Sequence, residues 1–192
     1  LAMCAKLGFT SEVTAHHLLF NASAEGAEYK VNPPLRLDGT RMGLMASVLA
    51  GGATMFGSDH APHAVSEKSS GYGQAPSGMP GVGALVPLFM ARVKRGEFPL
   101  ALLSRMGAAS PATAFSIRKG RIAVGYDADF AVFDSKKVVS IDPDALYGKS
   151  PYLPYAGMEA LFPDAVFIRG EAQILDGEYC GDRRGVDLFA GN

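Results

Sequence analysis

The sequence predicts an α/β protein, and three features of the chain carry that prediction. Residues 39–50 place apolar side chains at helical spacing, and Gly51 and Gly52 end that helix. The β-prone run 53–58 follows directly, and a helix joined to a strand by a short connection is typical of βα repeats. Beyond residue 120 the helical patterns give way to short β-like runs between turn residues.

The segments before this helix are short and mixed. In chain order they are a helix end at 1–6, an apolar run at 14–20 interpreted as a strand, a loop of small residues at 21–26, and an extended stretch at 28–36. The last stretch is extended because Pro33 biases the preceding residue, Asn32, away from helical backbone angles. Asp38 is the expected N-cap of the following helix, since aspartate side chains accept hydrogen bonds from its first free amides.

After the strand, the chain is polar and glycine-rich from residue 66 to residue 83. A loop of that length is uncommon inside a compact domain, and such loops usually serve a function. Three helices are expected next, near 82–95, 99–106 and 110–115. The last of them begins at the N-cap Ser110, with Pro111 at its first position.

The character of the chain changes near residue 120. The β-like runs that follow lie at 122–124, 128–134, 138–139 and 165–168. No strong helical pattern interrupts them. We therefore divide the chain into a first domain, 1–120, and a second domain, 121–192.

The composition is that of an ordinary globular protein, since 48% of the 192 residues are hydrophobic and 19% are charged. A net charge of −1 without a Lys/Arg cluster argues against nucleic-acid binding. Apolar stretches fall short of the roughly 20 residues needed to cross a bilayer, so no membrane association is expected.

Cys4 and Cys180 lack metal-type spacing and are interpreted as reduced thiols of a cytoplasmic protein. Because the chain starts at Leu1 rather than Met, within a helical pattern, we expect a fragment or a cleavage product.

One heptapeptide carries the chemistry: residues 57–63, GSDHAPH, directly after the apolar strand. A strand that ends in an acid and then turns at a proline presents Asp59 at its carboxyl end, where α/β barrels place their active sites. A carboxylate there can ligate a metal, accept a proton from a metal-activated water, or do both. The alternative is an ordinary turn aspartate.

The other candidate residues also have structural alternatives. His63 either contacts substrate or is a turn histidine at the surface, and Asn32 either caps the turn before a proline or offers a preorganised amide. His60 is assigned a structural hydrogen bond, because neighbouring residues in an extended turn point apart. The adjacent His16 and His17 invite a metal interpretation, but on a strand they would face opposite ways. We treat them as structural, with a role behind a metal ligand left open for one of them.

Several motifs, in this order, resemble the dihydroorotases of the amidohydrolase superfamily. They are EVTAHHLL at 12–19, NPPLR at 32–36, SDHAPH at 58–63, EK at 67–68, GRI at 120–122 and GYDAD at 125–129. Hydantoinases, dihydropyrimidinases and allantoinases share the strand-end Asp-His and the later Gly-x-Asp-Ala-Asp motif, whereas NPPLR together with DHAPH is typical of dihydroorotases. The resemblance covers nearly the whole chain but corresponds only to the C-terminal half of such an enzyme.

The resemblance implies the C-terminal part of a metal-dependent (β/α)8 TIM barrel in 1–120. It implies the C-terminal segment of a small β-sandwich in 121–192. The implied enzyme is a zinc-dependent cyclic amidohydrolase with one or two ions. It interconverts N-carbamoyl-L-aspartate and L-dihydroorotate in pyrimidine biosynthesis.

The resemblance also assigns roles to individual residues. Asp59 is a metal ligand and the general acid/base, taking up and returning the proton. Asn32 and His63 bind the substrate, His63 being suited to a carboxylate or a ring carbonyl. The backbone at Ser77 and Gly78 contacts the substrate as well. Relatives often have an aromatic residue at the position of Ser77, a departure that bears only on a side-chain role.

The remaining metal ligands of the family, a His-x-His pair, a bridging Lys or Asp and two single histidines, are expected upstream. No His-x-His occurs in this chain. The first expected partner is therefore the N-terminal half of the same enzyme, with a homodimer or a complex with aspartate transcarbamoylase left open. Two other functions also stay open: a non-catalytic dihydroorotase-like scaffold for aspartate transcarbamoylase, and a hydrolase of the hydantoinase, dihydropyrimidinase or allantoinase type.

Overall fold

The computed structural model of the chain describes residues 1–146, 148, 150, 152–182 and 185–189, and it is α/β as predicted. Its α-helices are α1 (Ala2–Lys6), α2 (Ala15–Leu19), α3 (Asp38–Leu49), α4 (Val65–Lys68), α5 (Leu85–Lys94), α6 (Leu100–Ser104) and α7 (Ser110–Ala114). Shorter turns are the 3-10 elements η1 (Ala27–Tyr29) and η3 (Pro143–Ala145) and the π-helical η2 (Arg105–Ala109). The strands are β1 (Glu12–Thr14), β2 (Met55–Gly57), β3 (Phe130–Val132), β4 (Val138–Ser140), β5 (Glu159–Leu161), β6 (Ala165–Ile168), β7 (Glu171–Leu175) and β8 (Glu178–Tyr179). Within the described ranges, the helices are all too short or too polar to cross a membrane.

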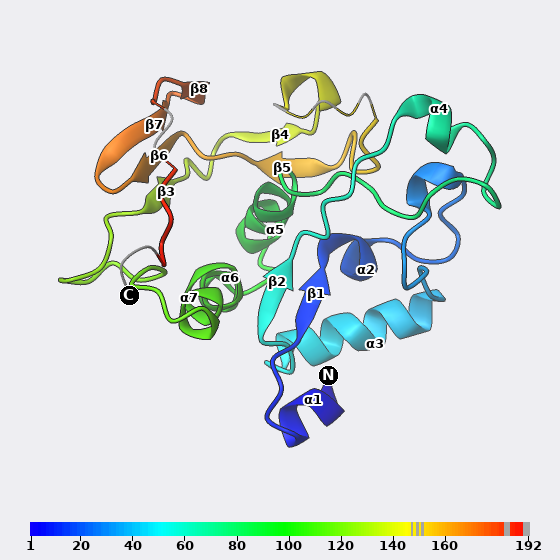
Figure 1. Cartoon of the computed structure of the whole chain (residues 1–192), viewed down its shortest axis with the longest axis horizontal. Helices are drawn as coiled ribbons and strands as arrows, with labels where there is room; N and C mark the ends of the chain where they lie inside the picture. Colours follow the sequence, from blue (N-terminus) through cyan, green and yellow to red (C-terminus); the bar gives the residue numbers. More distant parts are fainter. Residues whose placement is uncertain (147, 149, 151, 183–184, 190–192) are drawn as a thin grey trace.

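Strands β1 and β2 lie side by side near the middle of the molecule and run parallel, with Val13 opposite Phe56 (Figure 1). Helix α3 connects them along the chain, which confirms the predicted βα repeat. Val13 and Phe56 both belong to the hydrophobic core. Because the strands are parallel, their carboxyl ends share one edge, where α/β folds place their ligands. The residues that follow Thr14 and Gly57 meet at this edge.

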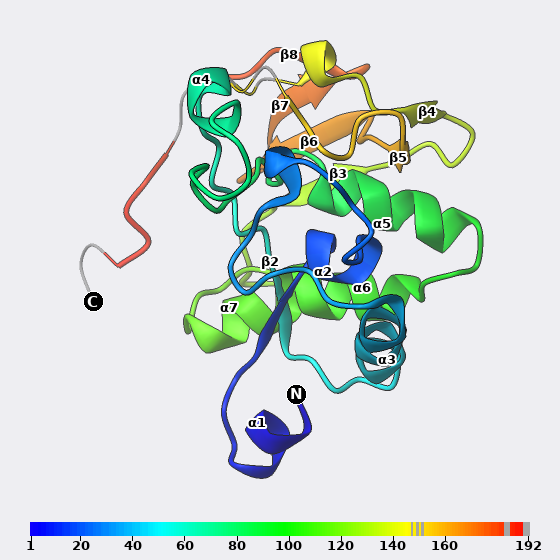
Figure 2. The same ribbon diagram turned by 90° about the vertical axis from the view of Figure 1, so that its right-hand side faces the viewer.

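An aromatic cluster fills the centre of the core. The ring of Phe89, from α5, lies 4.8 Å from that of Phe56 and 4.9 Å from that of Phe98, measured between centroids. The second half of the chain contributes Ile141, Leu153, Tyr155 and Ala160 to the same core. Figures 1 and 2 show why: α5 lies directly beneath the antiparallel pair β4–β5. The strands of this pair thus cover the helix that anchors the site region.

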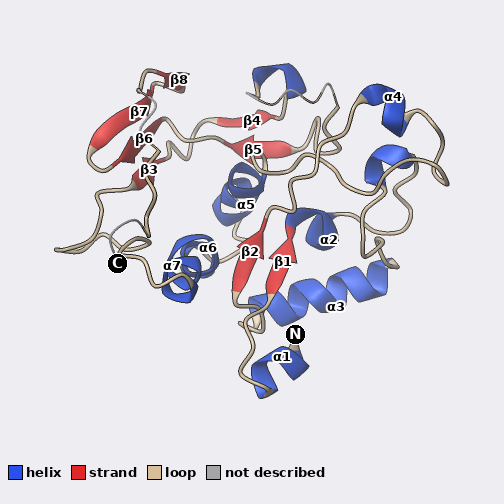
Figure 3. Cartoon of the chain, viewed as in Figure 1, coloured by secondary structure: helices blue, strands red, loops and turns tan. Residues whose placement is uncertain are grey.

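The other four strands form an antiparallel sheet in the order β3-β6-β7-β8. Figure 3 shows this sheet at one end of the molecule, apart from β1 and β2. Two tight hairpins build it, with two-residue turns at Arg169-Gly170 and Asp176-Gly177. The φ values are 51° and 81° in the first turn and 53° and 80° in the second, the sign that right-twisted hairpins require. The described residues form two other sheets, β1-β2 and β4-β5, each of two strands.

The segment that contains His16 and His17 is a helix, and its interpretation as a strand is wrong. Strand β1 ends at Thr14, whose hydroxyl accepts a hydrogen bond from the His17 amide at 3.4 Å and so caps α2. This is ordinary N-cap chemistry for threonine. Successive helical residues are about 100° apart, so the two histidines point to different parts of the same edge.

The predicted helix start at Ser110 is also wrong. Helices α6 and α7 form one continuous run through the π-helical turn η2, and Ser110 lies inside it. Pro111 has no amide hydrogen and its ring crowds the preceding turn of an α-helix. The wider π turn accommodates this proline without ending the helix.

Two further expectations from the sequence are wrong. Asp38 does not cap α3, because its carboxylate accepts a hydrogen bond from the Arg41 side chain at 2.7 Å. Ile122 and Val124 form no strand, and both side chains are exposed. An apolar alternation becomes a strand only where a neighbouring strand pairs with it.

Candidate functional site

Asp59 lies just beyond the carboxyl end of β2, and its side chain is 49% exposed. Its backbone is left-handed, with φ of 45°, a conformation that aspartate adopts more readily than most residues. At the same edge, α2 follows β1 directly and brings His16 to Asp59, with 3.7 Å between Nε2 and Oδ2. The structure therefore displays a strand-end carboxylate at the predicted edge.

His16 is fully buried beside this carboxylate, and neither of its ring nitrogens has a hydrogen-bond partner in the described part of the chain. Burial, and secondarily the neighbouring His17, lowers the pKa of His16 to about 4. The ring is therefore neutral at pH 7. Its contact with Asp59 is the approach of a neutral imidazole to a carboxylate rather than an ion pair.

His17 faces the segment that carries Asn32. Its Nε2 lies 2.9 Å from the carbonyl oxygen of Pro33, and its Nδ1 lies 2.7 Å from Oγ1 of Thr14. A carbonyl oxygen only accepts, so Nε2 donates to it, and in the Nε2–H tautomer Nδ1 accepts the threonine hydrogen. The Asn32–Pro33 peptide bond is cis, and Asn32 is exposed. His17 thus holds the turn that presents Asn32.

The glycine-rich loop pairs with the Asp59 segment. His60 and Met79 form a parallel bridge, and the Ala61 amide donates to the Met79 carbonyl at 3.0 Å. Gly78 beside this bridge has a φ of +134°, and a Cβ there would stand 2.7 Å from both Cβ and the carbonyl oxygen of Ala61. Only glycine permits this close approach of the two backbones.

His63 also forms a hydrogen bond to the glycine-rich loop. Its Nε2 donates to the Ser77 carbonyl at 3.1 Å, and its Nδ1 lies 3.7 Å from a carboxylate oxygen of Glu67. The Gly78 amide is already used, because it donates to the Lys30 carbonyl at 2.8 Å. Within the described residues, the Ser77 amide and hydroxyl have no hydrogen-bond partner. The Ser77 amide and hydroxyl are therefore available for a ligand, whereas the Gly78 amide is not.

His60 has the structural role that the sequence suggests. Its Nδ1 accepts hydrogen bonds from the amides of Gly81 and Val82, at 3.1 Å and 3.3 Å. A ring nitrogen whose lone pair is engaged in this way is not a metal ligand at that atom. His60 therefore anchors the backbone that follows the bridge.

Two lysines brace the glycine-rich loop, and sequence reasoning assigned neither of them a role. Lys68 is buried and donates to the carbonyls of Ala27 and Pro76, at 2.9 Å and 3.0 Å. Lys30 donates to the Tyr72 carbonyl at 2.7 Å. Burial lowers the pKa of Lys68. In the sequence, a lysine after a glutamate looks like an ordinary pair of surface charges. The buried position of Lys68 therefore could not be predicted from the sequence.

Asp59 fits one ligand of a metal site. Its carboxylate is accessible, and no hydrogen bond within the described residues engages it. Carboxylate oxygen is among the ligands that zinc accepts. The described residues contain no group of three or more His, Cys, Asp or Glu placed to hold one ion. A complete site on this edge needs further ligands from residues other than those described.

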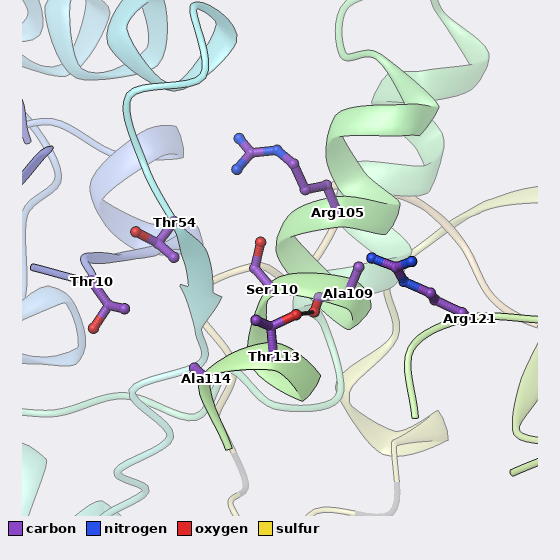
Figure 4. Close-up of a pocket in the computed structure, with 8 residues that line it drawn as sticks. All are labelled: Thr10, Thr54, Arg105, Ala109, Ser110, Thr113, Ala114 and Arg121. Atoms are coloured by element: carbon purple, nitrogen blue, oxygen red, sulfur yellow. Dashed lines mark hydrogen bonds between the residues drawn. The ribbon is translucent and has the colours of Figure 1, made fainter. Parts of the chain in front are cut away.

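A separate cavity of about 270 Å³ lies at the opposite ends of the strands. It is lined in part by Thr10 and Thr54, which precede β1 and β2, and by Arg105 and Arg121. Figure 4 shows the two arginine side chains approaching it from different segments. None of the predicted site residues lines this cavity, so it is distinct from the edge that carries Asp59.

Known proteins resemble this chain over most of its length. A sequence profile described as the amidohydrolase family matches residues 11–172. A dihydroorotase from Thermoplasma acidophilum is 41% identical over 179 residues, which cover 93% of this chain and 43% of that protein. A dihydroorotase from Methanosarcina mazei is 38% identical over 169 residues, which cover 85% of this chain and 37% of that protein. The chain thus spans about two fifths of the length of these relatives.

Solved structures share the fold. A D-hydantoinase (dihydropyrimidinase) from Thermus sp. superimposes with a TM-score of 0.85 at 27% identity, over 95% of this chain and 43% of that one. An L-hydantoinase (dihydropyrimidinase) from Arthrobacter aurescens gives a TM-score of 0.86 at 25% identity, over 94% and 42%. Both similarities include the β1–β2 region and most of the residues after it.

Proposed function

The chain belongs to the amidohydrolase family, and we propose that it forms the C-terminal part of a dihydroorotase. The proposed enzyme interconverts N-carbamoyl-L-aspartate and L-dihydroorotate. The observation that carries the proposal is the accessible carboxylate of Asp59 at the carboxyl end of β2, beside the loop that contains Ser77. The identity of 41% to a dihydroorotase over nearly the whole chain supports this substrate above other cyclic amides.

Asp59 has two roles in this proposal. It supplies one oxygen ligand to a divalent metal ion, which we take to be zinc, and the remaining ligands come from the N-terminal half of the enzyme. When bound, such an ion lowers the pKa of water and polarises a carbonyl. The Asp59 carboxylate takes the proton from the attacking water as the ring carbon–nitrogen bond breaks, and it returns that proton to the leaving nitrogen.

Three other residues bind the ring in this proposal. The exposed Asn32 offers its side-chain amide, and Ser77 offers its free backbone amide and hydroxyl. His63 donates its Nε2 hydrogen to the Ser77 carbonyl, and its Nδ1 lies 3.7 Å from a carboxylate oxygen of Glu67. We propose that His63 binds a carboxylate or a ring carbonyl of the substrate, the role that the resemblance to dihydroorotases implies. Gly78 contributes by the close backbone approach that sets the position of Ser77.

We also propose an architecture for the complete enzyme. Strands β1 and β2 with their helices are the last part of a (β/α)8 barrel, within residues 1–120. The sheet β3-β6-β7-β8 is this chain's share of a β-sandwich, within 121–192. The exposed apolar side chains of that sheet support the second assignment, since Val132 is 48% exposed. The N-terminal half of the enzyme is the first partner, and a homodimer or aspartate transcarbamoylase is a further one.

The decisive experiment replaces Asp59 by Asn in the complete enzyme and measures both turnover of dihydroorotate and bound metal. We expect turnover to fall about 10³-fold, because both the proton acceptor and a metal ligand are lost. Asp38→Asn is the matched control, an exposed aspartate that bonds Arg41 and lies outside the site. Turnover by Asp59→Asn at the level of the control would overturn the proposal.

The structural similarity to hydantoinases favours a second candidate, hydrolysis of a hydantoin or dihydropyrimidine ring. A panel of dihydroorotate, hydantoin, dihydrouracil and allantoin separates the two candidates by their kcat/KM values. A non-catalytic scaffold for aspartate transcarbamoylase would turn over none of them. Reading the upstream sequence for a His-x-His pair distinguishes that scaffold from both enzymes.

A further inference from the structure

The two histidines of α2 have no part in the function proposed above, and the geometry assigns them one. We infer that His16 and His17 are positioning residues: His16 holds the carboxylate of Asp59, and His17 holds the turn that presents Asn32. The inference rests on the proposed function, because it matters only if Asp59 and Asn32 act on a substrate.

The case for His16 begins with its burial. In the described part of the chain, the buried side-chain polar atoms without a hydrogen-bond partner are the two ring nitrogens of His16 and the hydroxyl of Tyr155. A buried donor without a partner is destabilising, because it has lost its hydrogen bond to water. The carboxylate of Asp59 lies 3.7 Å from Nε2, beyond the about 2.7–3.2 Å of a hydrogen bond. A small movement of the accessible carboxylate toward the buried ring would close that gap.

Chemistry decides which atom donates in this contact. An ionised carboxylate only accepts, and a neutral imidazole has a single N–H. Nε2 of His16 therefore carries the hydrogen, and it engages Oδ2 of Asp59. The other carboxylate oxygen, Oδ1, stays available for a metal or for the transferred proton. Donors behind a metal-binding side chain commonly fix its orientation in this way.

The case for His17 rests on two hydrogen bonds. Nε2 donates to the carbonyl of Pro33 at 2.9 Å, and Nδ1 accepts from Thr14 at 2.7 Å. Thr14 is both the last residue of β1 and the N-cap of α2. The turn that carries Asn32 is therefore tied to the end of a buried strand, although Asn32 itself is exposed.

The two histidines act as a pair because they share one helical turn. Their ring centroids lie 4.4 Å apart, with the planes inclined by 55°. One ring faces Asp59 and the other faces the Pro33 carbonyl, so α2 sets the distance between the proton acceptor and the substrate amide. A displacement of α2 would move both groups together.

The test uses the complete enzyme and compares substitutions that differ in where they place an amide nitrogen. Glutamine puts its nitrogen near the position of Nε2 in histidine, and asparagine puts it near Nδ1. We expect His16→Asn to lower kcat and the amount of bound metal per chain by about 10-fold, with little change in KM. His16→Gln restores most of both, because it keeps a donor at the position of Nε2.

The same pair of substitutions tests His17 through a different parameter. We expect His17→Asn to raise KM by about 10-fold with a smaller change in kcat, since the Asn32 turn loses its donor. His17→Gln keeps the hydrogen bond to Pro33 and restores KM. A merely structural role would lower kcat and raise KM in both variants equally, with no rescue by glutamine.

Three outcomes overturn the inference. They are wild-type kcat and metal content in His16→Asn, equal losses in the two variants of either histidine, and an unchanged KM in His17→Asn. Should a variant fail to fold, ¹⁵N NMR of the wild-type imidazoles decides, because both rings must be Nε2–H tautomers. If the wild-type enzyme does not turn over dihydroorotate, the proposed function has failed, and metal retention by the His16 variants still tests the contact with Asp59.

Discussion

Two regions of the molecule bury their apolar side chains to very different degrees. Around β1, β2 and α5, Phe89 and Phe98 are 0% and 2% exposed. In the sheet β3-β6-β7-β8, Phe130 and Val132 are 37% and 48% exposed, although β3 is as apolar as β2. Strands whose residues are nearly all apolar are normally covered on both faces of their sheet. The aromatic core of the first region is therefore buried by this chain's own residues, whereas the apolar side chains of β3 stay exposed and fit the proposed β-sandwich, which would cover them.

The largest expected effect tests this difference in burial by replacing one phenylalanine by alanine in each region of the complete enzyme. Phe89→Ala should lower the free energy of unfolding by about 3–5 kcal/mol, because it opens a cavity in the aromatic cluster. Phe130→Ala should cost only about 1–2 kcal/mol, since it chiefly removes a stacking contact with Phe167. Urea unfolding measures both values. A larger loss for Phe130→Ala would reverse the comparison and place the sheet in a deeper core.

A second test uses two glycines with positive φ. Gly78 has a φ of +134° and no room for a Cβ, whereas Gly177 has a φ of +80° and nothing within 4 Å. Gly177→Ala should cost about 1–2 kcal/mol for the left-handed backbone alone. Gly78→Ala adds the clash with Ala61 and should cost about 3 kcal/mol. It should also raise KM, because the Ser77 segment moves, whereas KM of Gly177→Ala stays at the wild-type value.

Two lysines give a third comparison, between a buried brace and a surface ion pair. Lys68→Met leaves the carbonyls of Ala27 and Pro76 without their donor and should cost about 2 kcal/mol. Lys137→Met removes an exposed pair with Asp164 and should leave the free energy of unfolding near the wild-type value. Hydrogen exchange of residues 69–77 should rise only in Lys68→Met. Unchanged exchange there would show that Lys68 does not hold the loop.

The smallest expected effect concerns two tyrosines and depends on pH. Burial, with the nearby Asp59, raises the pKa of Tyr155, whereas Tyr179 is exposed. An unfolded tyrosine ionises near pH 10 (about 10 in model peptides). Between that pH and the higher folded pKa, the unfolded chain binds fewer protons, so stability falls as pH rises.

Tyr155→Phe should therefore lose less stability than the wild type between pH 9 and pH 11, while Tyr179→Phe behaves as the wild type. At pH 7, Tyr155→Phe should change the free energy of unfolding by no more than about 1 kcal/mol, because the hydroxyl has no partner in the described residues. Urea unfolding at pH 7, 9 and 11 measures these free energies. An alkaline loss as large as that of the wild type would contradict the assigned burial of Tyr155.

Local patterns were sufficient for part of the fold. Helices α3 and α5 and strand β2 lie where apolar spacing and glycine breaks put them. Strands β7 and β8 were missed, although Asp176-Gly177 is a recognised hairpin signal that could have located both. The π turn at Pro111 had no comparable signal, since a proline after a serine is equally typical of a helix start.

The candidate site divides in the same way. The local strand end and proline turn mark Asp59 as a candidate, and the resemblance to dihydroorotases adds candidate roles for His63, Asn32, Ser77 and Gly78. The partners of these residues could not be named. His16 meets Asp59 across 43 residues of chain, and Lys68 reaches Ala27 across 41. Such contacts depend on how β1 and β2 pair, which no local pattern specifies.

The sequence by itself determined that this is an α/β chain with an acid at a strand end, and it supplied the candidate residues for the proposed chemistry. Only the tertiary structure decided that His16 and His17 lie on a helix, that one faces Asp59 and the other the Asn32 turn, and that Lys68 is buried. The physical reason is the distance along the chain over which each effect acts. Backbone preferences and apolar periodicity act over a few residues, whereas the burial of a polar group and the choice of its partner depend on segments that meet only after the strands have paired.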